Sequence, residues 1–452
     1  MVQQLVQGRV VIPLNLVSGF RGADAPADAD LTRCVHCGLC LNHCPTYVAT
    51  GQELESPRGR IALIRAVHEG RAPLSQTLIH HLDLCLQCRA CEAVCPSGVP
   101  YGRIIESAKA QIFTQKKEPR RKRIVRTAAL RALLPHKRVM RSVAEAFRLY
   151  ERCGLQGALR RSPIYRLLPD GLREMEQLTP RVSRRFFRPD AEFLPAFGAP
   201  RHRVALFTGC IMPYMNAETH AATVRVLRRN GCDVLIPKAQ NCCGALLVHS
   251  GDREPARELA RRNIDLLLGL DLDAVIINAA GCGSTLKEYG GLLKDDPQYA
   301  EKALHFDHLV KDVTEYVAAL PFDNNLGELD VRVTYQDSCH LVHAQRIKDA
   351  PRALLHAIPG LQLVEMAHAD MCCGSAGIYN IMQREMSMQV LDDKMREVAE
   401  TGAEVISTAN PGCMLQLETG LRRQSLPGRV VHVIELLDAS YRVAERNDAV
   451  QA

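Results

Sequence analysis

Apolar residues in the C-terminal half of the chain gather into short runs, and stretches with helical spacing lie between them. Between the first of these runs, residues 221–229 and 254–268 place apolar side chains three or four positions apart. The runs themselves resemble buried strands and occupy residues 204–207, 233–237 and 274–278, then 331–335, 361–364 and 404–408. Strands that alternate with helices in this way predict an α/β fold with parallel sheets.

The N-terminal part of the chain shows only the helical kind of spacing. Residues 61–68, 74–84 and 104–113 carry apolar side chains at helical intervals, and residues 57–60, Pro-Arg-Gly-Arg, predict a turn before the first of them. We therefore expect a mostly α-helical domain here.

Eight cysteines of this helical region form two copies of one pattern, C-x2-C-x2-C-x3-C-P. In proteins with two [4Fe–4S] clusters, the first three thiolates of such a run hold one cluster and the fourth holds the other. The predicted ligands are Cys34, Cys37, Cys40 and Cys95 for one cluster, and Cys85, Cys88, Cys91 and Cys44 for the other. Structural zinc also binds four thiolates, but its sites usually pair two separate C-x2-C knuckles.

A second set of cysteines follows the predicted strands. It repeats with offsets of 129, 130 and 131 residues, which indicates an internal duplication with pseudo-symmetry. These cysteines fall near the carboxyl ends of strands, where open α/β sheets bind ligands. The alternative is a set of ordinary buried thiols. The candidates are Cys210, Cys242, Cys243 and Cys282 in the first repeat, and Cys339, Cys372, Cys373 and Cys413 in the second.

The two repeats resemble the cysteine-rich CCG domains of heterodisulfide-reductase subunits. Together with the two-cluster region they resemble the iron–sulfur subunit of bacterial glycolate oxidase. The matching motifs are Cys-Val-His-Cys-Gly at 34–38, Cys-Pro-Thr-Tyr at 44–47, Pro-Arg-Gly-Arg-Ile at 57–61, Cys-Pro-Ser-Gly-Val at 95–99 and Cys-Cys-Gly-Ser-Ala-Gly at 372–377. The fullest CCG pattern ends in C-x2-C, whereas Thr285 and Gln416 stand at its last position here. Four thiols per repeat remain, enough for one or two further clusters in all.

The resemblance implies an electron-transfer subunit of a glycolate dehydrogenase complex, with no catalytic residue of its own. An FAD-containing partner subunit would oxidise glycolate to glyoxylate, and this chain would relay the electrons toward a quinone or another membrane acceptor. No G-x-G-x-x-G follows a predicted strand, so we expect neither flavin nor NAD on this chain. The alternatives are the same role in a D-lactate dehydrogenase complex, or a self-contained reductase of the CCG type.

These observations divide the chain into six predicted segments. They are an N-terminal lead-in at 1–30, an α-helical domain for two [4Fe–4S] clusters at 31–115, a basic helical linker at 116–200, CCG repeats at 201–325 and 326–445, and a tail at 446–452. A chain of 452 residues with 18 cysteines in ligand-like groupings suits a reducing cytoplasm, where the protein would be free or peripheral on the inner face of the cell membrane. No signal peptide or membrane span is expected.

Charge is distributed unevenly along the chain. Residues 116–190 hold 21 Lys and Arg against 7 Asp and Glu, although the whole chain has a net charge of only +7. Such a segment suits a solvated helical face, anionic lipid or an acidic partner, and nothing near it resembles a nucleic-acid module.

Two groups of residues lie outside the cysteine patterns. Cys153 and Cys232 match no motif and are interpreted as ordinary thiols. Asp337, His340 and His343 surround Cys339 in the sequence, and they are either structural residues or a proton relay.

Overall fold

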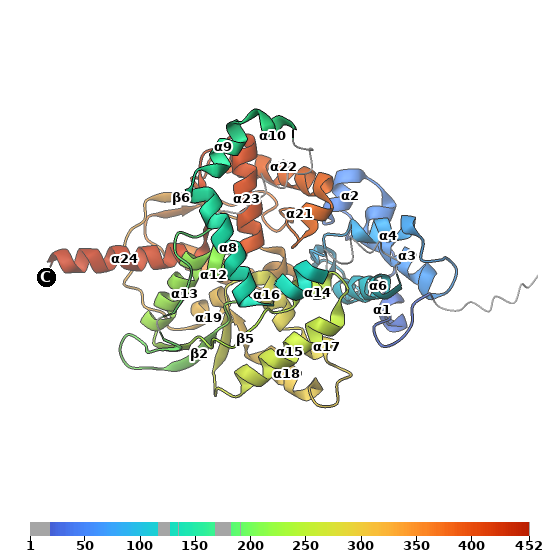
Figure 1. Ribbon diagram of the computed structural model, residues 1–452, viewed down its shortest axis with the longest axis horizontal. Helices are drawn as coiled ribbons and strands as arrows, with labels where there is room; N and C mark the ends of the chain where they lie inside the picture. The colour runs from blue at the N-terminus through green and yellow to red at the C-terminus, as the bar shows by residue number, and fades with distance from the viewer. Residues whose placement is uncertain (1–18, 116–126, 134, 168–181, 190, 452) are drawn as a thin grey trace, which may run out of the picture.

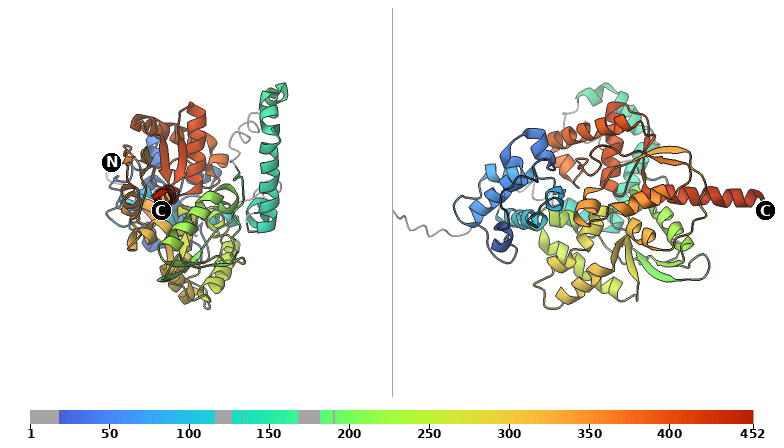
Figure 2. Two further views of the ribbon diagram at one scale, coloured as in Figure 1. Left: turned by 90° about the vertical axis from the view of Figure 1, so that its left-hand side faces the viewer. Right: turned by 180° about the vertical axis from the view of Figure 1, so that it is seen from behind.

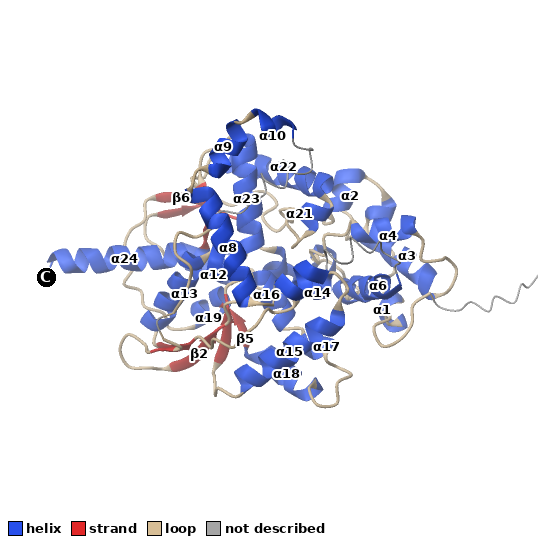
Figure 3. Ribbon diagram, in the orientation of Figure 1, coloured by secondary structure: helices blue, strands red, loops and turns tan. Residues whose placement is uncertain are grey.

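The computed structural model describes residues 19–115, 127–133, 135–167, 182–189 and 191–451. Parts of the predicted lead-in and linker, and the last residue of the predicted tail, lie outside these residues. A helical N-terminal domain packs against two α/β halves, as Figures 1 and 3 show. None of the described helices combines the length and the apolar character that crossing a bilayer requires.

The N-terminal domain is built from short helices around one apolar core. Its elements are α1 (Asp28–Leu31), α2 (Pro45–Thr50), η1 (Glu53–Glu55), α3 (Pro57–His68), α4 (Gln76–Asp83), α5 (Ala90–Ala93) and α6 (Tyr101–Gln115). The turn expected at residues 57–60 is wrong, because these residues form the first turn of α3. The side chain of Ser56 caps that helix by accepting from the N–H of Gly59, and Pro57 occupies the first helical position, where its missing N–H has no cost.

The described part of the linker up to residue 167 is mostly helical and lies along one edge of the molecule (Figure 2, left). Its elements are η2 (Ala128–Leu133), α8 (Lys137–Arg152), α9 (Leu155–Arg161) and α10 (Pro163–Leu167). The strand β1 (Phe193–Leu194) then joins the linker to the first α/β half by pairing antiparallel with β3 (Cys232–Leu235).

The first α/β half contains a sheet in the order β1-β3-β2-β4-β5, parallel except for β1. Its strands are β2 (His202–Leu206), β3 (Cys232–Leu235), β4 (Ala274–Ile277) and β5 (Val310–Asp312). Its helices are α12 (Met212–Met215), α13 (Ala217–Arg229), α14 (Ala245–His249), α15 (Arg253–Leu268), α16 (Ala280–Leu286), α17 (Tyr289–Leu292), α18 (Ala300–Leu309) and α19 (Val313–Ala319).

The second half repeats this plan, with an all-parallel sheet in the order β7-β6-β8-β9. Its strands are β6 (Val331–Tyr335), β7 (Leu361–Leu363), β8 (Val405–Thr408) and β9 (Arg429–His432). Its helices are η3 (His340–Ala344), α20 (Asp349–His356), α21 (Tyr379–Met382), α22 (Arg384–Thr401), α23 (Pro411–Gln424) and α24 (Val433–Gln451). The strand order of the two halves is equivalent, and the predicted duplicated fold with largely parallel sheets is confirmed.

The two halves share one buried apolar cluster that contains residues of both sheets. Val204 and Leu206 of β2 belong to the same cluster as Val333 and Tyr335 of β6. Helix α13 packs on α24, and the equivalent pair α20 and α19 packs in the same way. The carboxyl ends of β4 and β8 meet at one rim, where the N–H of Ala280 donates to the carbonyl of Ala409 at 3.1 Å.

The helical domain contacts this rim at several points. The Arg253 and Arg257 guanidiniums of α15 bind Asp24 at 2.8 and 2.5 Å. Gln87 Nε2 donates to the carbonyl of His249 at 3.2 Å, and Tyr379 Oη donates to the carbonyl of Leu84 at 2.8 Å. The domain is therefore held by both α/β halves.

Gly251 gives a test of this packing. Its φ is +83°, and a Cβ there would lie 2.2 Å from the carbonyl oxygen of Lys109 in α6. Gly251→Ala should therefore reduce stability by at least about 2 kcal/mol, through left-handed strain and displacement of α6. Thermal unfolding followed by circular dichroism measures the effect. Gly291→Ala is the matched control, because its Cβ would meet nothing within 4 Å; equal unfolding midpoints for the two variants would contradict the role given to Gly251.

Candidate metal centres

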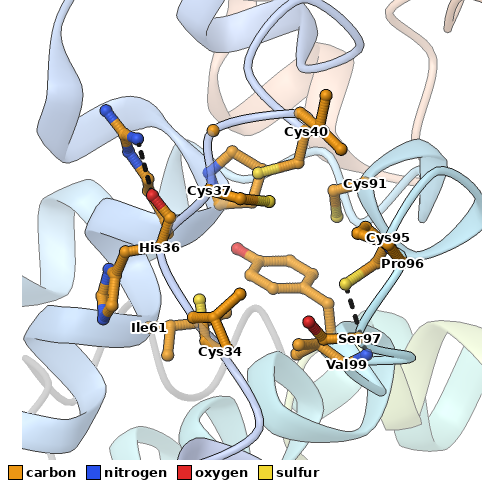
Figure 4. Close-up of a pocket in the computed structure, with 16 residues that line it drawn as sticks. Cys34, His36, Cys37, Cys40, Ile61, Cys91, Cys95, Pro96, Ser97 and Val99 are labelled. Carbon is orange, nitrogen blue, oxygen red and sulfur yellow. Dashed lines mark hydrogen bonds between the residues drawn. The ribbon is translucent and has the colours of Figure 1, made fainter.

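Five cysteines of the two motifs line a first cavity in the helical domain, and four of them are the predicted ligands of one cluster. Cys34, Cys37 and Cys40 come from the loop between α1 and α2, and Cys95 comes from the turn before α6 (Figure 4). The backbone N–H of Val99 donates to Cys95 Sγ at 3.4 Å. Cys37 is exposed and the other three are partly buried, so this cavity lies at the protein surface.

A second cavity lies beside the first and deeper in the protein. Its cysteines are Cys44, Cys85, Cys88 and Cys91, all of them buried. Cys91 and Tyr101 line both cavities, and the Tyr101 hydroxyl lies 3.5 Å from Cys85 Sγ. The structure thus brings together the two crossed sets of thiols that the motifs pair, while their ligation of clusters stays a prediction.

The backbone of both motifs turns at equivalent positions. His36 and Gly38 have positive φ of 55° and 87°, and the corresponding Gln87 and Arg89 have 54° and 63°. The turn allows the N–H of Gln87 to donate to Cys85 Sγ at 3.4 Å. Left-handed backbone is unfavourable for a side chain such as that of Arg89. Its guanidinium is held by ion pairs with Glu92 and Glu288, which fix the turn from two domains.

Arg60 places a buried positive charge at the wall of the second cavity. Its side chain is 1% exposed, it pairs with Glu55 at 2.6 Å, and its Nη1 lies 4.0 Å from Cys44 Sγ. Burial acts to lower the pKa of Arg60, but the neighbouring Cys85, Tyr101, Cys44 and Glu55 raise it above its usual value. Sequence reasoning missed this residue, since it lies 16 positions from Cys44 and was assigned to a turn.

The first repeat brings its four cysteines together at the rim of its sheet. Cys210 follows β2, Cys242 and Cys243 precede α14, and Cys282 lies in the first turn of α16. Cys210 Sγ and Cys242 Sγ are 3.6 Å apart, and both thiols are free. The N–H of Gly244, where φ is +84°, donates to Cys242 Sγ at 3.4 Å. Hydrogen bonds from Cys210 and Cys243 hold the pKa of Cys242 well below its usual value.

The second repeat reproduces this arrangement with Cys339, Cys372, Cys373 and Cys413. Hydrogen bonds from Cys339 and Cys373 hold the pKa of Cys372 well below its usual value. The N–H of Gly374, with φ of +89°, donates to Cys372 Sγ at 3.4 Å. In addition, Asn410 Nδ2 donates to Cys413 Sγ at 3.5 Å, and Asn410 Oδ1 accepts from the N–H of Gly281, next to Cys282. One side chain thus links the two repeats at their cysteine loops.

The two repeats differ in their relation to the helical domain. Cys88 of the second cavity shares a buried apolar cluster with Cys372, Leu86 and Tyr379, and Cys339 packs against that cluster. Burial, followed by the neighbouring Cys372 thiol, raises the pKa of Cys88 well above its usual value. Within the described residues, the apolar cluster that surrounds the cysteines of the first repeat contains none from the two motifs. The second cavity therefore adjoins the second repeat.

The two residues that stand where the fullest CCG pattern has its last cysteine are held by hydrogen bonds within this chain. Thr285 Oγ1 donates to the carbonyl of Gly281 at 3.3 Å. Gln416 is fully buried, donates to Ser387 Oγ at 3.0 Å and accepts from Asn380 at 3.2 Å. Both positions are built into the helices that carry Cys282 and Cys413.

Structural contacts also hold the polar residues near Cys339. Asp337 forms a bidentate ion pair with Arg352 at 2.8 and 2.9 Å. The ring Nε2 of His343 lies 2.9 Å from the carbonyl oxygen of Asp370. His340 Nε2 lies 3.1 Å from the carbonyl oxygen of Gln87, so it joins the second repeat to the second motif. A proton relay through these residues stays a prediction.

The two cysteines outside the patterns lie apart from these sites. Cys153 is exposed at the end of α8. Cys232 is buried in β3, where burial raises its pKa to about 12. Neither lines one of the two cavities of the helical domain.

The donor sets suit polynuclear clusters. Within the described part of the chain, no three His, Cys, Asp or Glu side chains converge on a site for a single metal ion. The thiols of the helical domain are instead spaced around cavities, with backbone N–H groups directed at their sulfurs. Four thiolates with such N–H donors are the environment of a [4Fe–4S] cluster.

Comparisons with known proteins agree with this geometry. Family models match as a "4Fe-4S dicluster domain" at residues 30–99, a "Cysteine-rich domain" (CCG) at 204–287 and 333–418, and "Glycolate oxidase iron-sulfur subunit, linker region" at 121–179. The chain is 47% identical to the probable glycolate oxidase iron-sulfur subunit of Bacillus subtilis and 34% identical to the glycolate oxidase iron-sulfur subunit of Escherichia coli. Each match covers 91% of this chain and 94% of the relative.

More distant matches share part of the chain or the fold alone. Lactate utilization protein A of Geobacillus kaustophilus is 32% identical over 52% of this chain and 99% of its own length. The crystal structure of a hypothetical protein from Helicobacter pylori superposes with a TM-score of 0.53 at 9% identity, covering 88% of this chain and 71% of that one. The latter likeness concerns the fold only.

Replacing Arg60 tests its electrostatic role. A buried cation beside a cluster favours the reduced, more negative state, so Arg60→Met should lower the midpoint potential of one cluster. A loss of about 1–2 kcal/mol of charge stabilisation corresponds to a potential lower by roughly 40–90 mV for one electron. Redox titration followed by electron paramagnetic resonance measures it.

Two further variants make this test specific. Arg60→Lys keeps the charge and should restore most of the potential. Arg65→Met removes a charge from the same helix at a side chain that is 41% exposed and paired with Glu69, and it should leave the potential unchanged. Equal shifts in Arg60→Met and Arg65→Met would contradict a local effect of Arg60.

Proposed function

The chain belongs to the family of glycolate oxidase iron–sulfur subunits, and we propose that it relays electrons from a flavin-containing partner subunit, which oxidises glycolate to glyoxylate, toward a quinone-type acceptor. As a member of that family it is a subunit of an oxidoreductase complex. The observation that carries the proposal is the continuity of cysteine sites: the two cavities share a wall, and the second adjoins the cysteines of the second repeat.

In this proposal the crossed sets of thiols hold two [4Fe–4S] clusters. Cys34, Cys37, Cys40 and Cys95 bind one, and Cys44, Cys85, Cys88 and Cys91 bind the other. When bound, each cluster supplies a one-electron carrier. The eight CCG cysteines are the ligand candidates for one or two further clusters.

The residues of the chain fix the order and the environment of these sites. Cys91 and Tyr101 line both cavities of the helical domain, so these two sites are adjacent. The apolar contact between Cys88 and Cys372 excludes water between the second cavity and the second repeat. Exposed Cys37 marks the first cavity as the side that a redox partner can approach. The partner therefore docks at the first cavity, and the repeats lie on the acceptor side.

Two alternatives have different support. The likeness to a lactate utilization protein favours lactate as a second candidate substrate for the partner subunit, because the pocket for the hydroxy acid is not assigned to this chain. A self-contained reductase would need the terminal C-x2-C pairs, whose last positions are the buried Gln416 and the hydrogen-bonded Thr285. We therefore rank the reductase last.

Reduction by substrate tests the proposal. The complex, purified under anaerobic conditions through a tag on this chain, should contain a flavoprotein and about 8 or more iron atoms per chain, four for each cluster. Added glycolate should bleach its visible iron–sulfur absorption, whereas this chain alone should not respond. If D-lactate bleaches the absorption and glycolate does not, lactate and not glycolate is the substrate of the complex. Reduction of the isolated chain without a flavoprotein would contradict the proposed relay.

A cysteine variant tests the onward connection. Cys372→Ser should leave the paramagnetic signals of the two clusters in the helical domain, but lower glycolate-dependent reduction of an external quinone analogue by at least about tenfold, as loss of a ligand contact does. Cys153→Ser removes an exposed thiol outside every candidate site and should retain full activity. If Cys372→Ser reduces the quinone analogue as fast as the unmodified complex, the second repeat does not take part in the relay.

A further inference from the structure

Helix α8 is attached to the body of the protein by only part of its circumference. Met140 and Ala144 are buried against Tyr214 of α12, with Ile211 and Phe186 packed around them. The Tyr214 hydroxyl donates to the carbonyl of Lys137 at 3.0 Å. The rest of the helix faces outward along one edge of the molecule (Figure 2, left).

Large apolar side chains are exposed on α8 and at the start of α9. Val139 is 45% exposed, Phe147 38% and Leu149 61%, and Leu155 at the start of α9 is 55% exposed. On the helical wheel, Phe147 lies about 20° from the buried Met140, at the edge of the packed face, whereas Leu149 and Val139 lie on the side opposite Ala144. Together with Ala146, which is also exposed, Leu149 and Val139 form an apolar stripe on the outward side. Burying such side chains in an apolar medium is favourable, at about 25 cal/mol per Å².

The charged side chains beside this stripe have one sign. The exposed ones described between residues 137 and 161 are all arginines, namely Arg138, Arg141, Arg152 and Arg161. The two acidic residues of the segment are partly buried and engaged elsewhere. Glu145 pairs with Arg148 and Arg188, and Glu151 accepts from the N–H of Val182. The outward face is therefore apolar and uniformly positive.

We propose that α8 and the start of α9 form a docking surface for a membrane that carries anionic lipids. Arginines beside a stripe of Leu and Val are the composition of a helix lying in the plane of the lipid headgroups. A protein interface would instead gather its apolar side chains in a central patch depleted of charge. Here the apolar stripe is narrow and arginines lie along one side of it on the same helix, which favours lipid over an acidic protein.

The position of this surface relates it to the first repeat. Ile211 and Tyr214, which pack on α8, follow Cys210 directly in the chain. A membrane bound along α8 would therefore lie on the side of the loop that follows Cys210. The proposal does not depend on the substrate of the complex, and it does not need the first repeat to hold a cluster.

Vesicle flotation of the intact complex tests the proposal. Vesicles of phosphatidylcholine with phosphatidylglycerol should bind the complex at low salt, and binding should fall as ionic strength rises. Arg138→Gln with Arg141→Gln should lower the partition coefficient by about 25-fold, from about fivefold for each basic residue near an anionic surface. Leu149→Ser with Leu155→Ser should also weaken binding, since the apolar contact is lost.

The control removes the same charge elsewhere. Arg262→Gln with Arg396→Gln changes two arginines that are 59% and 69% exposed on α15 and α22, and it should bind vesicles as the unmodified complex does. Circular dichroism and iron content verify folding in every variant. Equal binding to vesicles of phosphatidylcholine alone would overturn the proposal. It would also be overturned if the α8 variants lost the partner subunit while vesicle binding stayed unchanged, because α8 would then be a protein interface.

Discussion

The apolar contact between the second cysteine motif and the second α/β repeat is the constraint on which the arrangement of sites depends. Cys88 and Leu86 pack with Cys372 and Tyr379, and Cys339 closes the cluster. Polar contacts around this cluster fix the position of the second motif against the second repeat. The Tyr379 hydroxyl donates to the carbonyl of Leu84, and the His340 ring lies against the carbonyl of Gln87. Without this contact the helical domain would still be held to the first half by the ion pairs of Asp24, but its second cavity would no longer adjoin the cysteines of the second repeat.

The two α/β repeats arose by duplication and have equivalent folds, but the helical domain contacts them differently. Both repeats have the same strand order, the same left-handed glycine after the cysteine pair and the same donation of its N–H to sulfur. Among the described residues, the apolar cluster around the cysteines of the second repeat contains Cys88 of the two motifs, whereas the cluster around those of the first repeat contains none. Helix α8 packs instead on the loop after Cys210 in the first repeat. Two similar sites thus acquire different neighbours, and neighbours decide what a redox site can exchange electrons with.

Most of the fold and the thiol sets could be predicted because they depend on local spacing. The short apolar runs between helical segments identified the strands. The motif itself pairs its fourth cysteine with the three cysteines of the other copy, which gives the crossed grouping of Cys44 and Cys95. The turn predicted at residues 57–60 failed because Pro and Gly were read as breakers, although Pro suits the first helical position after the Ser56 cap. Arg60, Asn410 and the contact of Cys88 with Cys372 could not be found, since they join residues that only tertiary packing brings together.

The unequal exposure of the two motifs has a consequence for assembly. Cys37 remains exposed in the folded protein, whereas Cys44, Cys85, Cys88 and Cys91 are buried, and Cys88 packs against the second repeat. If these thiols hold the two clusters proposed above, an iron donor could still reach the outer site after folding. The inner site would have to be filled before the helical domain closes on the second repeat. The proposed arrangement thus implies an order of assembly in which the inner cluster is inserted first.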